Sequence, residues 1–348
     1  MTHRVAAIDC GTNSIRLLIA DITPDSGGKQ RDTERRPGAT ATAKPAPLTD
    51  VTRQMRIVRL GEGVDRTGRL SPAALDRTMT ALSEYAGLIA EAGPAAIRMV
   101  ATSATRDAAN SQEFTDRVRA ILGIAPEVIS GDKEAWLSYA GATRELAGTP
   151  LAAGGLCPPP YLVTDIGGGS TEFILGEPGE AQARETVPRD QLQGRSVNIG
   201  CVRMTERHLH GDPPLAAEIA ATIKDIDAAL ELAAEAVPAQ KARTLVGLAG
   251  SVTTVGAIAL GLAEYDSARI HHSRVTAARV HEIAGELLAM TRAERAAIPV
   301  MHPGRVDVIG AGALILDRIM TRFGFAEVLV SEHDILDGIA WSLVSQHD

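Results

Sequence analysis

One short pattern occurs twice in this chain, once in each half, and it constrains the fold more than any other feature. In the first copy an apolar run, Val5–Ile8, leads into Asp9-Cys10-Gly11-Thr12-Asn13-Ser14, and a second apolar run follows. In the second copy Tyr161–Thr164 leads into Asp165-Ile166-Gly167-Gly168-Gly169-Ser170-Thr171, and a further run begins at Glu172. Apolar runs on both sides of a glycine-containing turn predict strand, turn and strand. Two such units predict a duplicated fold.

The rest of the chain alternates predicted helices and strands, which indicates an α/β protein. Ser71-Pro72 predicts a helix start, with Ser71 as the N-cap, and Gly93-Pro94 predicts its end. A length of 348 residues suits two domains, which we place at 1–131 and 132–348, with the C-terminal helix packing back on the first. Residues 25–49 are predicted to be a flexible insertion, and an ordered hairpin tip is the alternative.

Composition limits the functional classes. The formal charge of −8 argues against general nucleic-acid binding, which depends on Lys and Arg contacts to phosphates. A local set of cations such as Arg106, Arg203, Arg269 and Arg305 still allows a polyanionic ligand. Three cysteines without a CxxC motif indicate a reducing compartment. There is no signal-peptide pattern and no apolar run of the roughly 18 residues that a membrane span requires, so we expect a cytoplasmic protein.

The two glycine turns are candidate phosphate sites. Backbone N–H groups and short polar side chains surround one point in such turns, which suits a phosphate, and Asp9 lies within reach of a metal there. In the second turn, Asp165 and Glu172 flank three glycines, and carboxylates that converge across a hairpin suit a hard cation. The alternative for the first turn is an ordinary hairpin turn that uses Asp, Gly and Asn for their turn propensity, and the alternative for the second is a glycine-rich flexible turn.

Three further segments carry residue types suited to phosphate chemistry. Glu134, in Ser130-Gly131-Asp132-Lys133-Glu134, is either a first-turn helix carboxylate or a base that deprotonates water. Arg106 follows a strand and has the forked donors that phosphate recognition uses, although a surface Arg is the alternative. Gly250-Ser251 begins a helix after a strand, which makes either an anion site or a simple cap.

Together these segments resemble the exopolyphosphatase / guanosine pentaphosphate phosphohydrolase (Ppx/GppA) family in its short two-domain form. The matching motifs occur in the family's order: Asp9-Cys-Gly-Thr-Asn-Ser, Ala101-Thr-Ser-Ala-Thr-Arg-Asp-Ala-Ala-Asn, Ser130-Gly-Asp-Lys-Glu-Ala, Asp165-Ile-Gly-Gly-Gly-Ser-Thr-Glu and Gly250-Ser-Val-Thr-Thr. The resemblance implies the actin/Hsp70/sugar-kinase fold, in which two ribonuclease H-like domains surround a cleft.

The resemblance also implies roles for individual residues. Glu134 would activate the water, and Asp165, Glu172 and Asp9 would bind Mg²⁺, or Mn²⁺ in its place. Phosphate would be held by Asp9, Gly11, Thr12, Asn13, Ser14, Arg106, Gly167, Gly168, Gly169, Ser170, Thr171, Gly250 and Ser251.

The implied activity is that of a phosphoric anhydride hydrolase acting on inorganic polyphosphate. Guanosine pentaphosphate hydrolysis and a weakly active polyphosphate or alarmone sensor are the alternatives. Lys133 stands where many relatives carry an acid, which leaves Glu134 as the one candidate base in that motif. The chain ends before the HD-type helical domain of the long family members, so we expect either a weaker grip on long polyphosphate or a homodimer.

Overall fold

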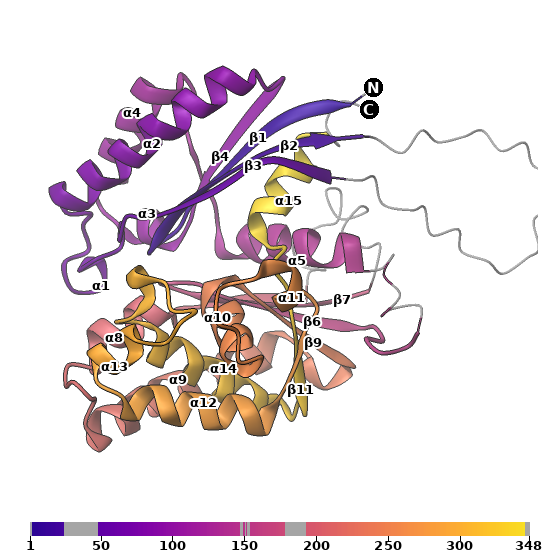
Figure 1. The fold of residues 1–348 in the computed structure, drawn as a ribbon. Coiled ribbons are helices and arrows are strands. Elements are labelled where there is room, and N and C mark those ends of the chain that lie inside the picture. The colour runs from indigo at the N-terminus through magenta and orange to yellow at the C-terminus, as the bar shows by residue number, and fades with distance from the viewer. Residues whose placement is uncertain are drawn as a thin grey trace, which may run out of the picture.

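The computed structural model describes residues 2–23, 48–146, 149, 151, 154–177 and 193–344, and it contains two layers built on separate β-sheets (Figure 1). The first sheet has the strand order β3-β2-β1-β4-β5, in which β1 is antiparallel to β2 and parallel to β4. Its elements are β1 His3–Cys10, β2 Ser14–Ile22, β3 Leu48–Ile57, α1 Val64–Thr67, α2 Pro72–Ala92, β4 Ala96–Ala101, α3 Ser103–Asp107, α4 Ser111–Leu122 and β5 Glu127–Val128.

The second sheet has the order β10-β11-β9-β6-β7-β8, with β6 antiparallel to β7 and parallel to β9. Its elements are β6 Tyr161–Ile166, β7 Thr171–Gly176, β8 Gly194–Val197, α8 Cys201–His208, α9 Ala216–Ala236, η2 Ala239–Lys241, β9 Thr244–Leu248, α10 Ala249–Ala259, α11 Ser267–Ile270, β10 Arg274–Thr276, α12 Ala277–Ala289, α13 Arg292–Ala296, η3 Pro303–Arg305, α14 Ile309–Phe323 and β11 Glu327–Val330.

The two sheets repeat one topology. In each, a three-strand antiparallel unit (β1-β2-β3 or β6-β7-β8) is extended from its first strand by parallel strands (β4-β5 or β9-β11). The predicted duplication and the actin-like fold with two ribonuclease H-like units are thereby confirmed. Both hairpin turns, the one after Asp9 and the one after Asp165, lie at the equivalent end of their sheets.

Two helices connect the layers. Helix α5, Gly131–Leu146, contacts strands β6 to β9 and also packs on α15, Ile335–Ser342. Helix α15 in turn contacts β1 and β2, where Ile339 and Trp341 share a hydrophobic cluster with Val5 and Leu18. In Figure 1, α5 and α15 lie between the two sheets. The domain boundary near residue 131 stays a prediction, because α5 contacts elements of both layers.

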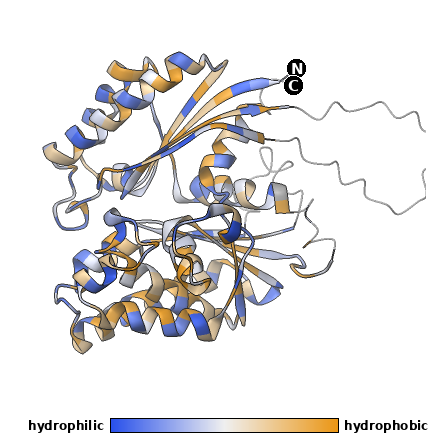
Figure 2. Cartoon of the chain, in the orientation of Figure 1, coloured by the Kyte–Doolittle hydropathy of each residue, from blue (hydrophilic) through white to orange (hydrophobic). Residues whose placement is uncertain are grey.

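Hydrophobic patterning explains the layers. The strands β1, β6 and β7 are almost wholly buried, as expected for sheets covered on both faces. Along the surrounding helices hydrophobic and hydrophilic residues alternate (Figure 2), as expected for helices that bury one side and expose the other. Among the described residues, no helix combines the length and the apolar character that a bilayer crossing requires.

The predicted ends of α2 are confirmed, and the predicted bounds of the 25–49 insertion need one correction. The Ser71 hydroxyl accepts the Ala74 N–H, and Gly93 caps the same helix in the left-handed conformation, as predicted. The insertion predicted at 25–49 lies largely outside the described residues. Its last two positions, Leu48 and Thr49, belong to β3, because they pair with Ile22 and Asp21 of β2.

Candidate active site

A cavity of about 90 Å³ lies where the two hairpin turns face each other. It collects residues from both sheets and from the starts of α3, α5 and α10. Of the residues predicted from the sequence, those that line it are Asp9, Gly11, Thr12, Asn13, Ser14, Glu134, Asp165, Gly167, Gly168, Ser170, Gly250 and Ser251. Arg106, Gly169, Thr171 and Glu172 lie outside this lining.

The two turns approach each other so closely that the second requires glycine. A Cβ atom on Gly168 would lie 2.9 Å from Thr12 Cβ, and one on Gly169 would lie 2.6 Å from Ser103 Oγ. The Thr12 and Ser103 hydroxyls also bond each other at 2.8 Å. The N–H groups of Gly11 and Gly167 close their own turns by donating to Ser14 O and Ser170 O. These glycines therefore bring the two sheets together, besides any role in phosphate binding.

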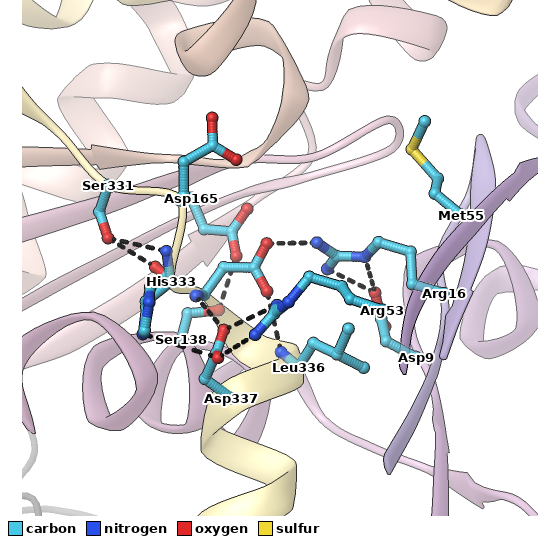
Figure 3. Close-up of polar contacts among 12 residues, drawn as sticks. Asp9, Arg16, Arg53, Met55, Ser138, Asp165, Ser331, His333, Leu336 and Asp337 are labelled. Carbon is cyan, nitrogen blue, oxygen red and sulfur yellow. Dashed lines mark hydrogen bonds and ion pairs between the residues drawn. The ribbon is translucent and has the colours of Figure 1, made fainter. Parts of the chain in front are cut away.

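In the first hairpin, Asp9 pairs across the strands with Arg16. Arg16 Nη2 and Nε donate to Asp9 Oδ2 at 2.7 and 3.0 Å (Figure 3). Arg16 Nη1 also bonds Asp334 at the start of α15. Asp9 Oδ1 is buried without a hydrogen-bond partner. One Asp9 oxygen is thus committed to an ion pair, and only the other is open to a ligand.

In the second hairpin, the equivalent cross-strand pair consists of two acids, Asp165 and Glu172. Both are buried, at 7% and 2% exposure. Burial raises the pKa of Asp165 to about 6, and the Asp334 charge adds to this. Burial, with the charges of Glu134 and Asp165, raises the pKa of Glu172 well above its ordinary value. The duplicated hairpins therefore differ at one position, which is cationic in the first and anionic in the second.

Glu134 lies in the first turn of α5, faces the cavity and is 8% exposed. Burial raises its pKa to about 8, against the opposing effect of Arg106. Arg106 Nη1 donates to Glu134 Oε2 at 3.1 Å and to Ile129 O at 3.0 Å, so in this structure the arginine contacts the candidate base. The neighbouring Lys133 bonds Glu127 at 3.0 Å instead, on an exposed surface.

Sequence reasoning missed Arg16, Ser138 and Ser196. Arg16 lines the cavity. The sequence could have indicated it by alignment of the two hairpins, because Arg16 occupies the position in the first hairpin that Glu172 occupies in the second. Among the four cations named as a local set, Arg305 lines the cavity and donates to Thr254 Oγ1 at 3.0 Å. Arg203 is held by Gly169 O, Asp65 and Asp107.

The arrangement predicts a pH dependence for the metal-free protein. The Glu134 pKa rises from 4.5 to about 8 and the Asp165 pKa from 3.8 to about 6. The folded carboxyls hold their protons more tightly than the unfolded ones, so this contribution to stability is present at low pH and lost as pH rises through 6 and 8. Denaturant unfolding with chelator present should show this decline, and Glu134→Gln should show a shallower one. A decline equally steep in both proteins would contradict the assignment.

The donor set fits a divalent cation shared with substrate. No cluster of three or more His, Cys, Asp or Glu arranged for a metal occurs within the part of the chain that is described. Mg²⁺ is commonly bound by one or two carboxylates together with substrate phosphates and waters, so such a cluster is not required. The buried Asp165 and Glu172 repel each other, and Asp9 Oδ1 lacks a partner, which are the features that a bound cation would compensate.

Two ribonuclease H-like units, with an acid-lined cavity between their hairpin turns, define an actin-like enzyme with a site suited to phosphoryl groups. The model of the Ppx/GppA phosphatase family matches residues 39–347, and the chain belongs to this family. It is therefore a phosphatase. Phosphatases of this family generally depend on a divalent metal ion.

The similarity to individual relatives covers nearly the whole chain. Exopolyphosphatase 2 of Mycobacterium tuberculosis is 46% identical over 98% of both chains. A guanosine-5'-triphosphate,3'-diphosphate pyrophosphatase of Aeromonas salmonicida is 29% identical over 99% of this chain and 60% of its own length. The crystal structure of an exopolyphosphatase-like protein superposes with a TM-score of 0.83 at 40% identity, covering 99% of each chain.

Proposed function

We propose that this phosphatase is an exopolyphosphatase, which hydrolyses the terminal phosphate of inorganic polyphosphate. One observation carries the proposal: Glu134, Asp165 and the glycine turn of the second hairpin line the same cavity, with Glu172 in the cross-strand position beside Asp165. The 46% identity to a protein named exopolyphosphatase 2 supports this choice of substrate.

In this mechanism Glu134 holds a water in line with the terminal phosphoryl group and accepts its proton as the water oxygen bonds to phosphorus. The bond to the leaving phosphate breaks in the same step, and orthophosphate and the shortened polyphosphate are released. Asp165 and Glu172 would hold the divalent metal, Mg²⁺ or Mn²⁺, which would supply charge neutralisation on the phosphate oxygens. Arg305 lines the same cavity and provides a positive charge that contacts the polyphosphate substrate. Most of the acceleration comes from positioning and charge, because the transition state of phosphoryl transfer is loose.

Arg106 has a defined part in this scheme. Its hydrogen bond to Glu134 Oε2 favours the charged carboxylate, which is the form that accepts a proton. Arg16 pairs with both Asp9 and Asp334 and offsets part of the negative charge at the first hairpin, whereas the second hairpin has Glu172 in the place of Arg16. The negative charge that attracts the metal is therefore greater at the second hairpin.

Guanosine pentaphosphate is the second candidate substrate, and one observation favours it. A larger cavity of about 460 Å³ shares Arg16, Met55, Gly250 and Arg305 with the first. Its lining adds apolar side chains and an aromatic ring, which suit a nucleoside better than a chain of phosphates: Val300, Met301, Leu336 and Tyr265.

Phosphate release should therefore be measured from long polyphosphate, short polyphosphate, guanosine pentaphosphate and ATP, with and without Mg²⁺. The proposal expects metal-dependent release that is fastest from polyphosphate. Faster release from guanosine pentaphosphate would favour the second candidate. Release that is slow from all four would favour a sensor.

Binding of polyphosphate should weaken steeply as salt rises, in spite of the net negative charge of the chain. Polyphosphate would be held by local cations such as Arg305 and by the metal, and salt screens such contacts. The measurement is the dissociation constant of polyphosphate from the Glu134→Gln variant across a range of salt concentrations. A flat response would contradict charge-based recognition.

A further inference from the structure

The two carboxylates of the second hairpin each receive a hydrogen bond from a serine that the proposed mechanism leaves unused. Ser138 Oγ donates to Asp165 Oδ2 at 2.6 Å, and Ser196 Oγ donates to Glu172 Oε1 at 2.7 Å. Figure 3 shows Ser138 next to Asp165. A hydroxyl fixes one oxygen of a carboxylate and so sets the direction of the other.

The two serines reach the carboxylates by different structural routes. Asp165, Glu172 and Ser196 are successive cross-strand neighbours on β6, β7 and β8, so they form a row across the sheet. Ser138 comes from α5, one turn after Glu134 and on the same side of the helix. The helix that carries the candidate base is thus bonded directly to one of the acids beneath it.

The close packing of Gly131 against Ser196 is a second observation that the Ser196 side chain is fixed in position. A Cβ atom on Gly131 would lie 2.3 Å from Ser196 Cβ and 2.7 Å from Ser196 Oγ. The start of α5 can therefore approach β8 only because residue 131 has no side chain. Any larger residue would have to displace the serine that bonds Glu172.

The type of donor matters for electrostatics. In the first hairpin the carboxylate of Asp9 is held by the cationic Arg16, which it shares with Asp334 and which offsets part of its charge. In the second hairpin neutral hydroxyls hold the acids, so both are oriented while the negative charge stays available for a cation. Partners of this kind, bonded to ligating carboxylates, typically contribute 10–100-fold in metal affinity or activity.

We infer that Ser138 and Ser196 are positioning residues that orient Asp165 and Glu172 for a divalent cation. The inference rests on the proposed function, because it takes these two carboxylates as the metal ligands. It assigns the serines no contact with substrate or with the attacking water.

The test measures Mn²⁺ binding directly, by electron paramagnetic resonance on the full chain without substrate. Ser138→Ala and Ser196→Ala should each raise the Mn²⁺ dissociation constant about 10–100-fold. Activity of both variants should recover towards the wild-type level at high metal concentration. The matched control is Thr143→Val, because the Thr143 hydroxyl is also buried on α5 but, among the described residues, donates to Tyr139 O of the same helix and not to a carboxylate. This control should bind Mn²⁺ as the wild type does.

Asp165→Asn tests the proposed metal site separately from the proposed role of the two serines. If Asp165→Asn binds Mn²⁺ as well as the wild type does, the proposed metal site itself is wrong. If Asp165→Asn loses binding while both serine variants bind normally, the inference is overturned and the proposed function stands. A loss of affinity equal to that of Thr143→Val would also overturn the inference, because it would reflect packing alone.

Discussion

Replacing Glu134 by glutamine should lower turnover about 10²–10⁴-fold and leave the affinity for polyphosphate near that of the wild type. Glutamine keeps the shape of the side chain but cannot accept the proton of the attacking water. The cavity lining that would contact the substrate, including the second glycine turn and Arg305, is unchanged by the substitution. Steady-state rates and equilibrium binding, measured on one preparation, separate these two effects.

A structural explanation of Glu134 predicts something different. If the carboxylate only complements the α5 dipole, its loss costs about 0.3–1 kcal/mol of stability and turnover is retained. Lys133→Ala provides the neighbouring control, since Lys133 bonds Glu127 on the surface and does not line the cavity. We expect it to leave both turnover and binding unchanged. An active Glu134→Gln enzyme would remove the proposed base and leave the fold and family untouched.

Asp165→Asn and Glu172→Gln should lower metal-dependent turnover on the order of 10²–10³-fold, because a bound metal contributes several kcal/mol to the transition state. Without metal, neither variant should be less stable than the wild type. The wild-type site holds Glu134, Asp165 and Glu172 close enough that their charges oppose one another, and each substitution removes one of those charges. The melting temperature with chelator, measured beside the rate with Mg²⁺, checks both statements.

The metal dependence of stability provides the contrast. Mg²⁺ should raise the melting temperature of the wild type and should have little effect on either variant, because binding to the folded state alone stabilises it. A large, metal-dependent stabilisation of Asp165→Asn would show that the cation binds elsewhere. A variant that unfolds without metal would show that the carboxylate has a structural role.

The sequence was informative wherever a local pattern has one physical outcome. The repeated hairpin predicted the duplicated fold, and Ser71 with Gly93 predicted the ends of α2. Twelve predicted positions line the common cavity, and nine of them belong to the two Asp-x-Gly turns, which face each other from equivalent ends of their sheets. The homodimer stays a prediction.

The sequence could not show which side chains far apart along the chain contact each other in the fold. In the sequence Arg16 is an ordinary strand residue, and only the fold shows that it bonds Asp9 and Asp334. Ser138 lies within a predicted helix, and only the fold brings it to Asp165. The side-chain direction of Lys133 depends on Glu127, which belongs to the adjacent strand. The three glycines were expected to make room for phosphate, whereas Gly168 and Gly169 also make room for Thr12 and Ser103.

The proposed activity is the removal of terminal phosphates from polyphosphate with Glu134 as the base. Its most direct test is the release of label from end-labelled long-chain polyphosphate with Mg²⁺, by the wild type and by Glu134→Gln. We expect the wild type to release the label at once as orthophosphate, and the variant to do so about 10²–10⁴-fold more slowly. Equal rates in the two proteins, or label released in fragments longer than orthophosphate, would contradict it.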